Sequence, residues 1–154
     1  VHFQTSGGPE PYLLHIEADA WGNKFECLLR PPVTVQPPKG FTERDMNTRG
    51  LESRMVVPWL AQMAKTVRTV VTYDADRLLQ VMETEISRLG RGAWSRPGIQ
   101  FISLKDKAAC MKEVPEGADL SIATASIYGA PQDNLQGIKA LHEHEEIKTL
   151  LELV

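Results

Sequence analysis

The stretch that decides the fold is LLHIEADAWG, residues 13–22. It starts with an apolar run and then carries two acidic side chains, Glu17 and Asp19, separated by one residue. On a regular strand that spacing places both carboxylates on the same face. The stretch therefore predicts a β-strand whose end presents a pair of acids.

The chain around this stretch is predicted to be β-structure. Residues 12–16 form a short apolar run, Gly22-Asn23 is a turn signal, and apolar residues alternate over residues 24–29. Together these features predict a β-hairpin. Residues 33–35 lie between two proline pairs and are expected to form a third strand at the sheet edge, where proline is tolerated.

From residue 42 onward helical and strand patterns alternate. One helix is expected from Thr42 to near Gly50, and a second helix is expected to have Pro58 in its first turn. Further helices are expected over 76–89, 105–112, 120–128 and 137–154. Strands are expected over 67–72 and 99–104. This order predicts an α/β fold with a mixed five-stranded sheet, a three-strand meander followed by parallel strands, flanked by helices. The whole chain, residues 1–154, is expected to form one domain.

The composition is that of an ordinary globular protein, with 42% hydrophobic and 24% charged residues. No apolar run approaches the roughly 18 residues of a membrane span, and residues 1–8 lack the features of a signal peptide. A cytoplasmic protein that does not enter a membrane is therefore expected. The formal charge of −3 argues against indiscriminate binding to duplex backbone. Cys27 and Cys110 are expected to be buried free thiols in a strand and a helix.

Motifs along nearly the whole chain resemble those of the DnaQ-like 3′-to-5′ exonucleases, a ribonuclease-H-like family. Residues 13–22 resemble the first motif, a strand ending in Asp-x-Glu-Thr-x-Gly, with the two acids exchanged. Residues 40–46 resemble the His-Gly-Ile-Thr element, with Lys39 in place of the histidine. Residues 70–78 resemble the second motif, His-Asn-Ala-x-Phe-Asp, and residues 137–143 the third, His-x-Ala-x-x-Asp. The resemblance implies a ribonuclease-H-like sheet.

The resemblance also implies a function, the hydrolysis of phosphodiesters at single-stranded DNA or RNA 3′ ends by two-metal catalysis. Two Mg²⁺ or Mn²⁺ ions, which prefer oxygen ligands, would be held by Glu17, Asp19 and Glu143. Asp74 or Asp76 would complete the catalytic set, although capping of a helix is the simpler interpretation of Asp76.

Three further residues are assigned to binding the nucleic-acid strand: Trp21, Tyr73 and Arg77. Trp21 follows the acid pair and could stack on a terminal base. Packing of Trp21 against the neighbouring hairpin is the alternative interpretation.

Two departures from the family pattern leave catalytic competence open. Leu78 stands where the second motif has its aspartate, and Ile138 stands where the third motif has the histidine that activates water. Leucine cannot bind a metal, and a general base is commonly worth about a hundred- to ten-thousand-fold in rate. The alternative function is therefore a catalytically inactive exonuclease fold that binds nucleic acid, a protein partner or a second copy of itself.

Residues 142–146, HEHEE, allow other interpretations. His142 and Glu146 are four residues apart and could form one edge of a metal site, although a solvated helix face is the simpler interpretation. His144 falls on an apolar stripe, where a core histidine is expected, or it replaces the missing base.

Arginine and tryptophan side chains outside these motifs also allow predictions. Arg88, Arg91 and Arg96 form either a basic rim for the strand backbone or a solvated set of charges. Trp59 is expected in the core.

Overall fold

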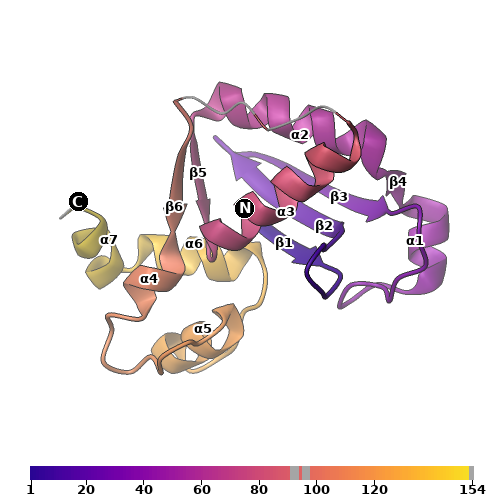
Figure 1. The fold of residues 1–154 in the computed structure, drawn as a ribbon. Helices are drawn as coiled ribbons and strands as arrows, with labels where there is room; N and C mark the ends of the chain where they lie inside the picture. The colour runs from indigo at the N-terminus through magenta and orange to yellow at the C-terminus, as the bar shows by residue number, and fades with distance from the viewer. Residues whose placement is uncertain (91–93, 95–97, 153–154) are drawn as a thin grey trace. The chain divides into compact units, whose positions relative to one another are not determined.

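The structure, a computed structural model, describes residues 1–90, 94 and 98–152 (Figure 1). Three residues of earlier predictions lie outside the described residues. They are Arg91 and Arg96 of the predicted basic rim and Val154 at the end of the predicted closing helix. The elements are β1 (His2–Thr5), β2 (Leu13–Ala20), β3 (Asn23–Arg30), α1 (Glu43–Arg49), β4 (Leu51–Glu52), α2 (Ser53–Val67), β5 (Thr69–Thr72), α3 (Ala75–Arg88), β6 (Gln100–Ser103), α4 (Leu104–Ala108), α5 (Leu120–Tyr128), α6 (Leu135–Glu143) and α7 (Glu145–Glu152).

The fold is α/β with a mixed sheet. Four strands are hydrogen-bonded in the order β1-β2-β3-β4, and β5 pairs with β6 in a second sheet. β2 and β3 are antiparallel, whereas β3 and β4 are parallel. The predicted hairpin is confirmed by this pairing, and the α/β class with a mixed sheet is confirmed as well.

The chain forms two compact units. Unit 1 comprises residues 1–2, 71–75 and 101–154, and unit 2 comprises residues 3–70 and 76–100. Each unit contains an apolar cluster of its own. That residues 1–154 form one domain stays a prediction.

Unit 1 is held together by an apolar cluster of helical side chains. Leu104, Leu141 and Ile147 are fully buried in it, and Tyr73 contributes a buried ring. The Tyr73 hydroxyl donates a hydrogen bond to the carbonyl of Ala118. Burial, together with nearby Asp119 and Asp74, raises the pKa of Tyr73 to about 12, so the phenol stays protonated as a donor.

Unit 2 is built around the β2–β3 hairpin. Leu14 of β2, Leu28 of β3 and Met46 of α1 form a buried cluster. α2 also contacts β3, and Figure 1 shows α2 running along the hairpin. The hairpin is therefore the scaffold on which the acid pair of residues 13–22 is presented.

The predicted helix after residue 42 is confirmed, and its sequence explains both ends. The Thr42 hydroxyl accepts from the Asp45 amide at 3.1 Å, and the Asp45 carboxylate accepts from the Thr42 amide at 2.9 Å. This reciprocal pair is a capping box, and hydrogen bonding by Thr42 lowers the pKa of Asp45. The helix ends at Gly50, whose ψ of 131° is extended. A Cβ there would lie 2.3 Å from the Met46 carbonyl oxygen, so this position requires glycine.

The start of β2 is fixed by a buried carboxylate on α3. Glu85 is 2% exposed and accepts from the Leu13 amide at 3.3 Å. Arg88 donates to Glu85 at 2.7 Å and lies 3.6 Å above the Tyr12 ring. Arg88, one arginine of the predicted basic rim, therefore holds the strand in place.

Several of the predicted elements are wrong in place or length, and the helix predicted over 105–112 is shorter, since α4 ends at Ala108. Residues 33–35 form no strand, because the flanking prolines lack the amide donors that a ladder needs. Pro58 is not in the first turn of its helix, since α2 begins at Ser53, and Pro58 removes one interior hydrogen bond instead.

The closing helix is two helices. His144 has φ −66° and ψ 133°, which ends α6, and its carbonyl accepts from Lys148 at 2.9 Å to begin α7. On one straight helix Leu141 and Ile147, six residues apart, would point in different directions. The break at His144 lets both side chains bury fully in the cluster of unit 1.

Candidate metal site

The candidate site lies on one face of the hairpin. The register pairs His15 with Leu28, Glu17 with Glu26 and Asp19 with Lys24. Because strand side chains alternate between faces, these six side chains share a face. Two carboxylates, Glu17 and Glu26, are therefore directly opposite each other. Like charges in this position destabilise an antiparallel pair.

The turn of the hairpin presents a strained, exposed tryptophan. Ala20 pairs with Asn23, so Trp21 and Gly22 are the central residues, with φ of 52° and 84°. Positive φ at both positions is the geometry of a type I′ turn, which favours asparagine or glycine and is unfavourable for a bulky side chain. Trp21 is 80% exposed. The expectation that it packs against the hairpin is wrong, and its indole face is open to a ligand.

Three potential metal ligands converge below that turn. His15, Glu17 and Glu26 each offer a ligand atom, and these atoms lie within 4.8 Å of one another. The solvent exposure of the three side chains increases in order: His15 is buried, Glu17 is half-buried and Glu26 is exposed. A site of this kind is closed on one side and open to solvent on the other.

His15 has an unusual environment. Its side chain is 6% exposed, and its ring packs against Phe41 with centroids 4.8 Å apart. Nε2 lies 3.1 Å from Oε1 of Glu26, within ion-pair distance but without the geometry of a hydrogen bond. Nδ1 likewise has no hydrogen-bond partner among the described residues. A buried polar atom left in this way needs an explanation beyond folding.

Asp19 has a different role from Glu17 in this arrangement. Its Oδ1 accepts from the Gly22 amide at 2.8 Å, which stabilises the turn. Its cross-strand neighbour is Lys24, a cation, whereas Glu17 faces a second carboxylate. The two-ion site that the resemblance implies stays a prediction, because its third ligand, Glu143, belongs to unit 1. A single ion beside Glu17 fits the three residues.

Residues of the second motif are distributed over both units. In unit 1, Asp74 lies 3.6 Å from Lys105 Nζ, and Tyr73 is a core residue. In unit 2, Asp76 is exposed in the first turn of α3, and Arg77 donates to Gln80 at 2.8 Å. Leu78 is buried. The burial of Tyr73 favours a packing role over base stacking.

The third motif lies in unit 1. Glu143 is exposed near the end of α6, and its negative charge adds to the burial that raises the pKa of Tyr128. Ile138 is 3% exposed in the apolar cluster. Convergence of Glu143 with Glu17 and Asp19 stays a prediction.

The histidines near this motif show no metal site. His142 is exposed, and His144 caps α6 with its ring 5.9 Å from that of Tyr128. Among the described residues, the three-ligand group of the hairpin is the one that is found.

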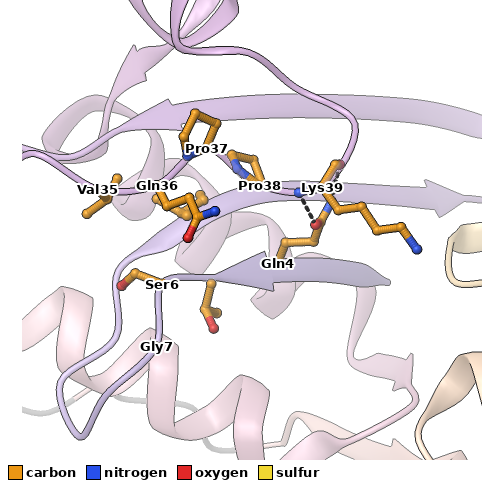
Figure 2. Close-up of a pocket in the computed structure, with 10 residues that line it drawn as sticks. Gln4, Ser6, Gly7, Val35, Gln36, Pro37, Pro38 and Lys39 are labelled. Carbon is orange, nitrogen blue, oxygen red and sulfur yellow. Dashed lines mark hydrogen bonds between the residues drawn. The ribbon is translucent and has the colours of Figure 1, made fainter.

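A cavity of about 320 Å³ lies elsewhere in unit 2, between the end of β1 and residues 35–39. Figure 2 shows Gln4 and Lys39 at its rim, where the Lys39 amide donates to the Gln4 side chain at 2.9 Å. Ser6 and Gln36 add polar groups to its wall. Its lining residues carry neither a carboxylate nor an imidazole, and Lys39 is their one titratable side chain.

Two other predictions about side chains are corrected. Trp59 is not a core residue, since it is 48% exposed, although its ring meets Phe25 edge-on at 5.2 Å. Cys27 and Cys110 are free as predicted, but neither is fully buried: Cys27 is half-buried, and Cys110 is exposed and lies beyond the end of α4. Burial and the charge of Glu26 raise the pKa of Cys27.

His15 and Glu26 were missed by the sequence analysis. The signal that finds them is the hairpin register, because a turn centred on Trp21-Gly22 places Glu26 opposite Glu17. A two-residue turn at Gly22-Asn23 would have placed Leu28 there instead.

No family model matches the chain, and no curated protein matches it. Each helix formed by the described residues is too short or too polar to cross a bilayer.

Proposed function

We propose that the protein is a divalent-metal-dependent phosphodiester hydrolase, a divergent 3′-to-5′ exonuclease of single-stranded nucleic acid with a ribonuclease-H-like fold. The observation that carries this proposal is the placement of the Glu17 carboxylate directly opposite Glu26, beside a buried histidine. Two opposed carboxylates at the end of an apolar strand favour a bound cation. The motif resemblance supplies the reaction class.

The ion in such a reaction polarises the phosphate and acidifies bound water. The chain's own residues would divide the remaining work. Glu17 holds the ion, and Asp19 fixes the turn through the Gly22 amide. Trp21, exposed at that turn, offers a face on which the terminal base stacks, an interaction worth about 1–3 kcal/mol per base.

The strained backbone of Trp21 supports this assignment. A bulky residue with φ of 52° costs about 1–2 kcal/mol relative to glycine. An exposed residue held in such a conformation contributes little to packing, so a binding role accounts for it better than a structural one.

The experiment is cleavage of a 5′-labelled single strand of DNA or RNA in millimolar Mn²⁺. We expect products that shorten from the 3′ end. Replacing Glu17 and Asp19 by alanine together should abolish cleavage while leaving strand binding in chelator unchanged. Glu116→Gln, at an exposed glutamate of unit 1, is the control and should cleave as the unmodified protein does. Cleavage that survives the double substitution would contradict the assignment.

A second function is favoured by one specific observation. Leu78 and Ile138, at the positions of the family's aspartate and histidine, are 4% and 3% exposed and belong to the buried apolar residues. A fold with these positions committed to packing would suit a catalytically inactive module that binds a single strand or a protein. Binding without any cleavage over hours in Mn²⁺ would establish that function instead.

A further inference from the structure

We propose that His15, Glu17 and Glu26 form a binding site for one borderline divalent cation, which prefers Zn²⁺ to Mn²⁺ and Mn²⁺ to Mg²⁺. The site shares Glu17 with the proposed exonuclease, but His15 and Glu26 belong to none of the motifs that suggested it. Metal binding would stand even if the protein cleaved nothing.

Clusters of acidic side chains are common on protein surfaces without any ion, and His15 is what distinguishes this one. Its side chain is 6% exposed, and Nε2 points at the carboxylate of Glu26 from 3.1 Å. Neither ring nitrogen has a hydrogen bond among the described residues. Leaving a buried polar group unsatisfied costs about 1–3 kcal/mol. A cation bound at Nε2 would satisfy that nitrogen and neutralise the two opposed carboxylates together.

The charges on this face of the hairpin point the same way. Glu17 and Glu26 are cross-strand neighbours on one face of the hairpin. A divalent ion placed between the two glutamates would convert a repulsive pair into shared ligands.

The distances suit a single ion. Zinc holds nitrogen and oxygen ligands at about 2.0–2.2 Å in tetrahedral geometry, so two of its ligand atoms lie about 3.5 Å apart. The three ligand atoms here lie within 4.8 Å of one another. Glu26 has a 48% exposed side chain with room to make the small inward movement required. Its exposure also provides the path by which an ion enters.

The donor set selects the metal. Imidazole nitrogen suits zinc and other transition metals, whereas all-oxygen sites suit Mg²⁺, and Zn²⁺ stands above Mn²⁺ in general affinity order. Three protein ligands also leave a position open to water, as in catalytic zinc sites.

The test is calorimetric titration of the metal-free protein with Zn²⁺, Mn²⁺ and Mg²⁺ in turn. We expect one ion per chain, bound in the order given above. Glu17→Gln and Glu26→Gln should each weaken zinc binding at least about tenfold. His15→Gln should remove the preference for zinc over magnesium. His142→Ala, at an exposed histidine of unit 1, is the matched control and should bind as the unmodified protein does.

A second readout is the visible spectrum of Co²⁺, whose bands report nitrogen ligation and should change in His15→Gln. Because His15 is buried, that variant can fail to fold. Glu26→Gln changes a half-exposed side chain and keeps the test decisive.

The proposal is overturned if zinc shows no saturable binding. It is also overturned if zinc binding is unchanged in both Glu17→Gln and Glu26→Gln, or if it is lost in His142→Ala. Zinc binding without cleavage would support this site and end the proposed exonuclease. If His15→Gln and Glu26→Gln still cleave the strand and the unmodified protein binds no zinc, the proposed exonuclease is supported and the zinc site is overturned.

Discussion

The apolar cluster of unit 1 and the β2–β3 hairpin of unit 2 differ in the hydrogen bonding of their most buried polar side chains. In the cluster, Tyr73 donates to the Ala118 carbonyl, and the buried Thr124 hydroxyl donates to Leu120 and accepts from the Gln132 amide, both at 2.8 Å. In the hairpin, the buried nitrogens of His15 have no hydrogen bond. The hydrogen bonds of Tyr73 and Thr124 are explained by folding, whereas the unsatisfied nitrogens of His15 are not.

The hairpin also carries two further costs that the cluster does not. Glu17 faces a like charge across the strands, and Trp21 has a positive φ although it is 80% exposed. Natural proteins keep such features where binding or catalysis requires them. The difference between the two regions is therefore our reason for placing the function on the hairpin and the stability of unit 1 in its cluster.

The largest expected effect tests the structural side of this comparison. Leu104 is fully buried in the cluster of unit 1, so Leu104→Ala should lower the free energy of unfolding by about 2–5 kcal/mol. Urea denaturation measures it. Leu51→Ala, at a leucine that is 49% exposed, is the control and should cost far less. A loss below about 1 kcal/mol for Leu104→Ala would mean that the cluster is not what stabilises the unit.

A second prediction separates binding from stability at the hairpin turn. Trp21→Asn places a residue preferred in type I′ turns before Gly22, so stability should hold or rise. Affinity for a labelled single strand should fall by about 1–3 kcal/mol, the contribution of one stacked base. Fluorescence anisotropy in chelator measures the affinity, and thermal unfolding measures the stability. A variant that loses stability and keeps its affinity would assign Trp21 to packing.

The sequence was sufficient for the elements whose signals are local. The alternation over residues 13–29 predicted the hairpin, and Thr42, Asp45 and Gly50 define a helix by capping chemistry that depends on neighbours alone. The break at His144 was not predictable in this way. It depends on burying Leu141 and Ile147 in a cluster formed with distant parts of the chain.

Half of the candidate site was predictable from the sequence, and the other half depends on the position of the turn, which the sequence indicated one residue too late. Glu17 and Asp19 are apparent from their spacing on a strand. Glu26 becomes a neighbour of Glu17 only if the turn is centred on Trp21-Gly22. Tryptophan with positive φ is rarely favourable, so the sequence indicated Gly22-Asn23 instead. A shift of one residue in a turn changes every cross-strand partner.

A third prediction uses a buried carboxylate of unit 2 that is satisfied, unlike those of the hairpin face. Burial raises the pKa of Glu85 above its ordinary 4.5, although the Leu13 amide and Arg88 oppose the rise. The folded state then holds the proton more tightly than the unfolded chain. This contribution to stability is complete below pH 4.5 and is lost as the pH rises through the raised pKa.

Glu85→Gln keeps the side chain neutral at every pH. The free energy of unfolding of this variant, relative to the unmodified protein, should therefore increase as the pH rises across the weakly acidic range. Urea midpoints at several pH values measure it. A relative stability that falls with pH would show that the ion pair with Arg88 outweighs the burial of the carboxylate.

The smallest expected effect is the most direct test of the comparison, because it asks whether the hairpin sacrifices stability for a ligand. Glu26→Gln removes one of two like charges that face each other, so the metal-free protein should gain about 0.2–1 kcal/mol in its free energy of unfolding. Glu116→Gln, which has no such partner across a strand, should change it little. Zinc should then raise the melting temperature of the unmodified protein more than that of Glu26→Gln, since at a given concentration a ligand that binds more tightly stabilises the folded state more. If Glu26→Gln instead destabilises the metal-free protein, the attraction between Glu26 and His15 exceeds the repulsion from Glu17. His15 and Glu26 would then form a structural ion pair, satisfied like Tyr73 and Thr124 of unit 1, and the contrast between the two regions would disappear.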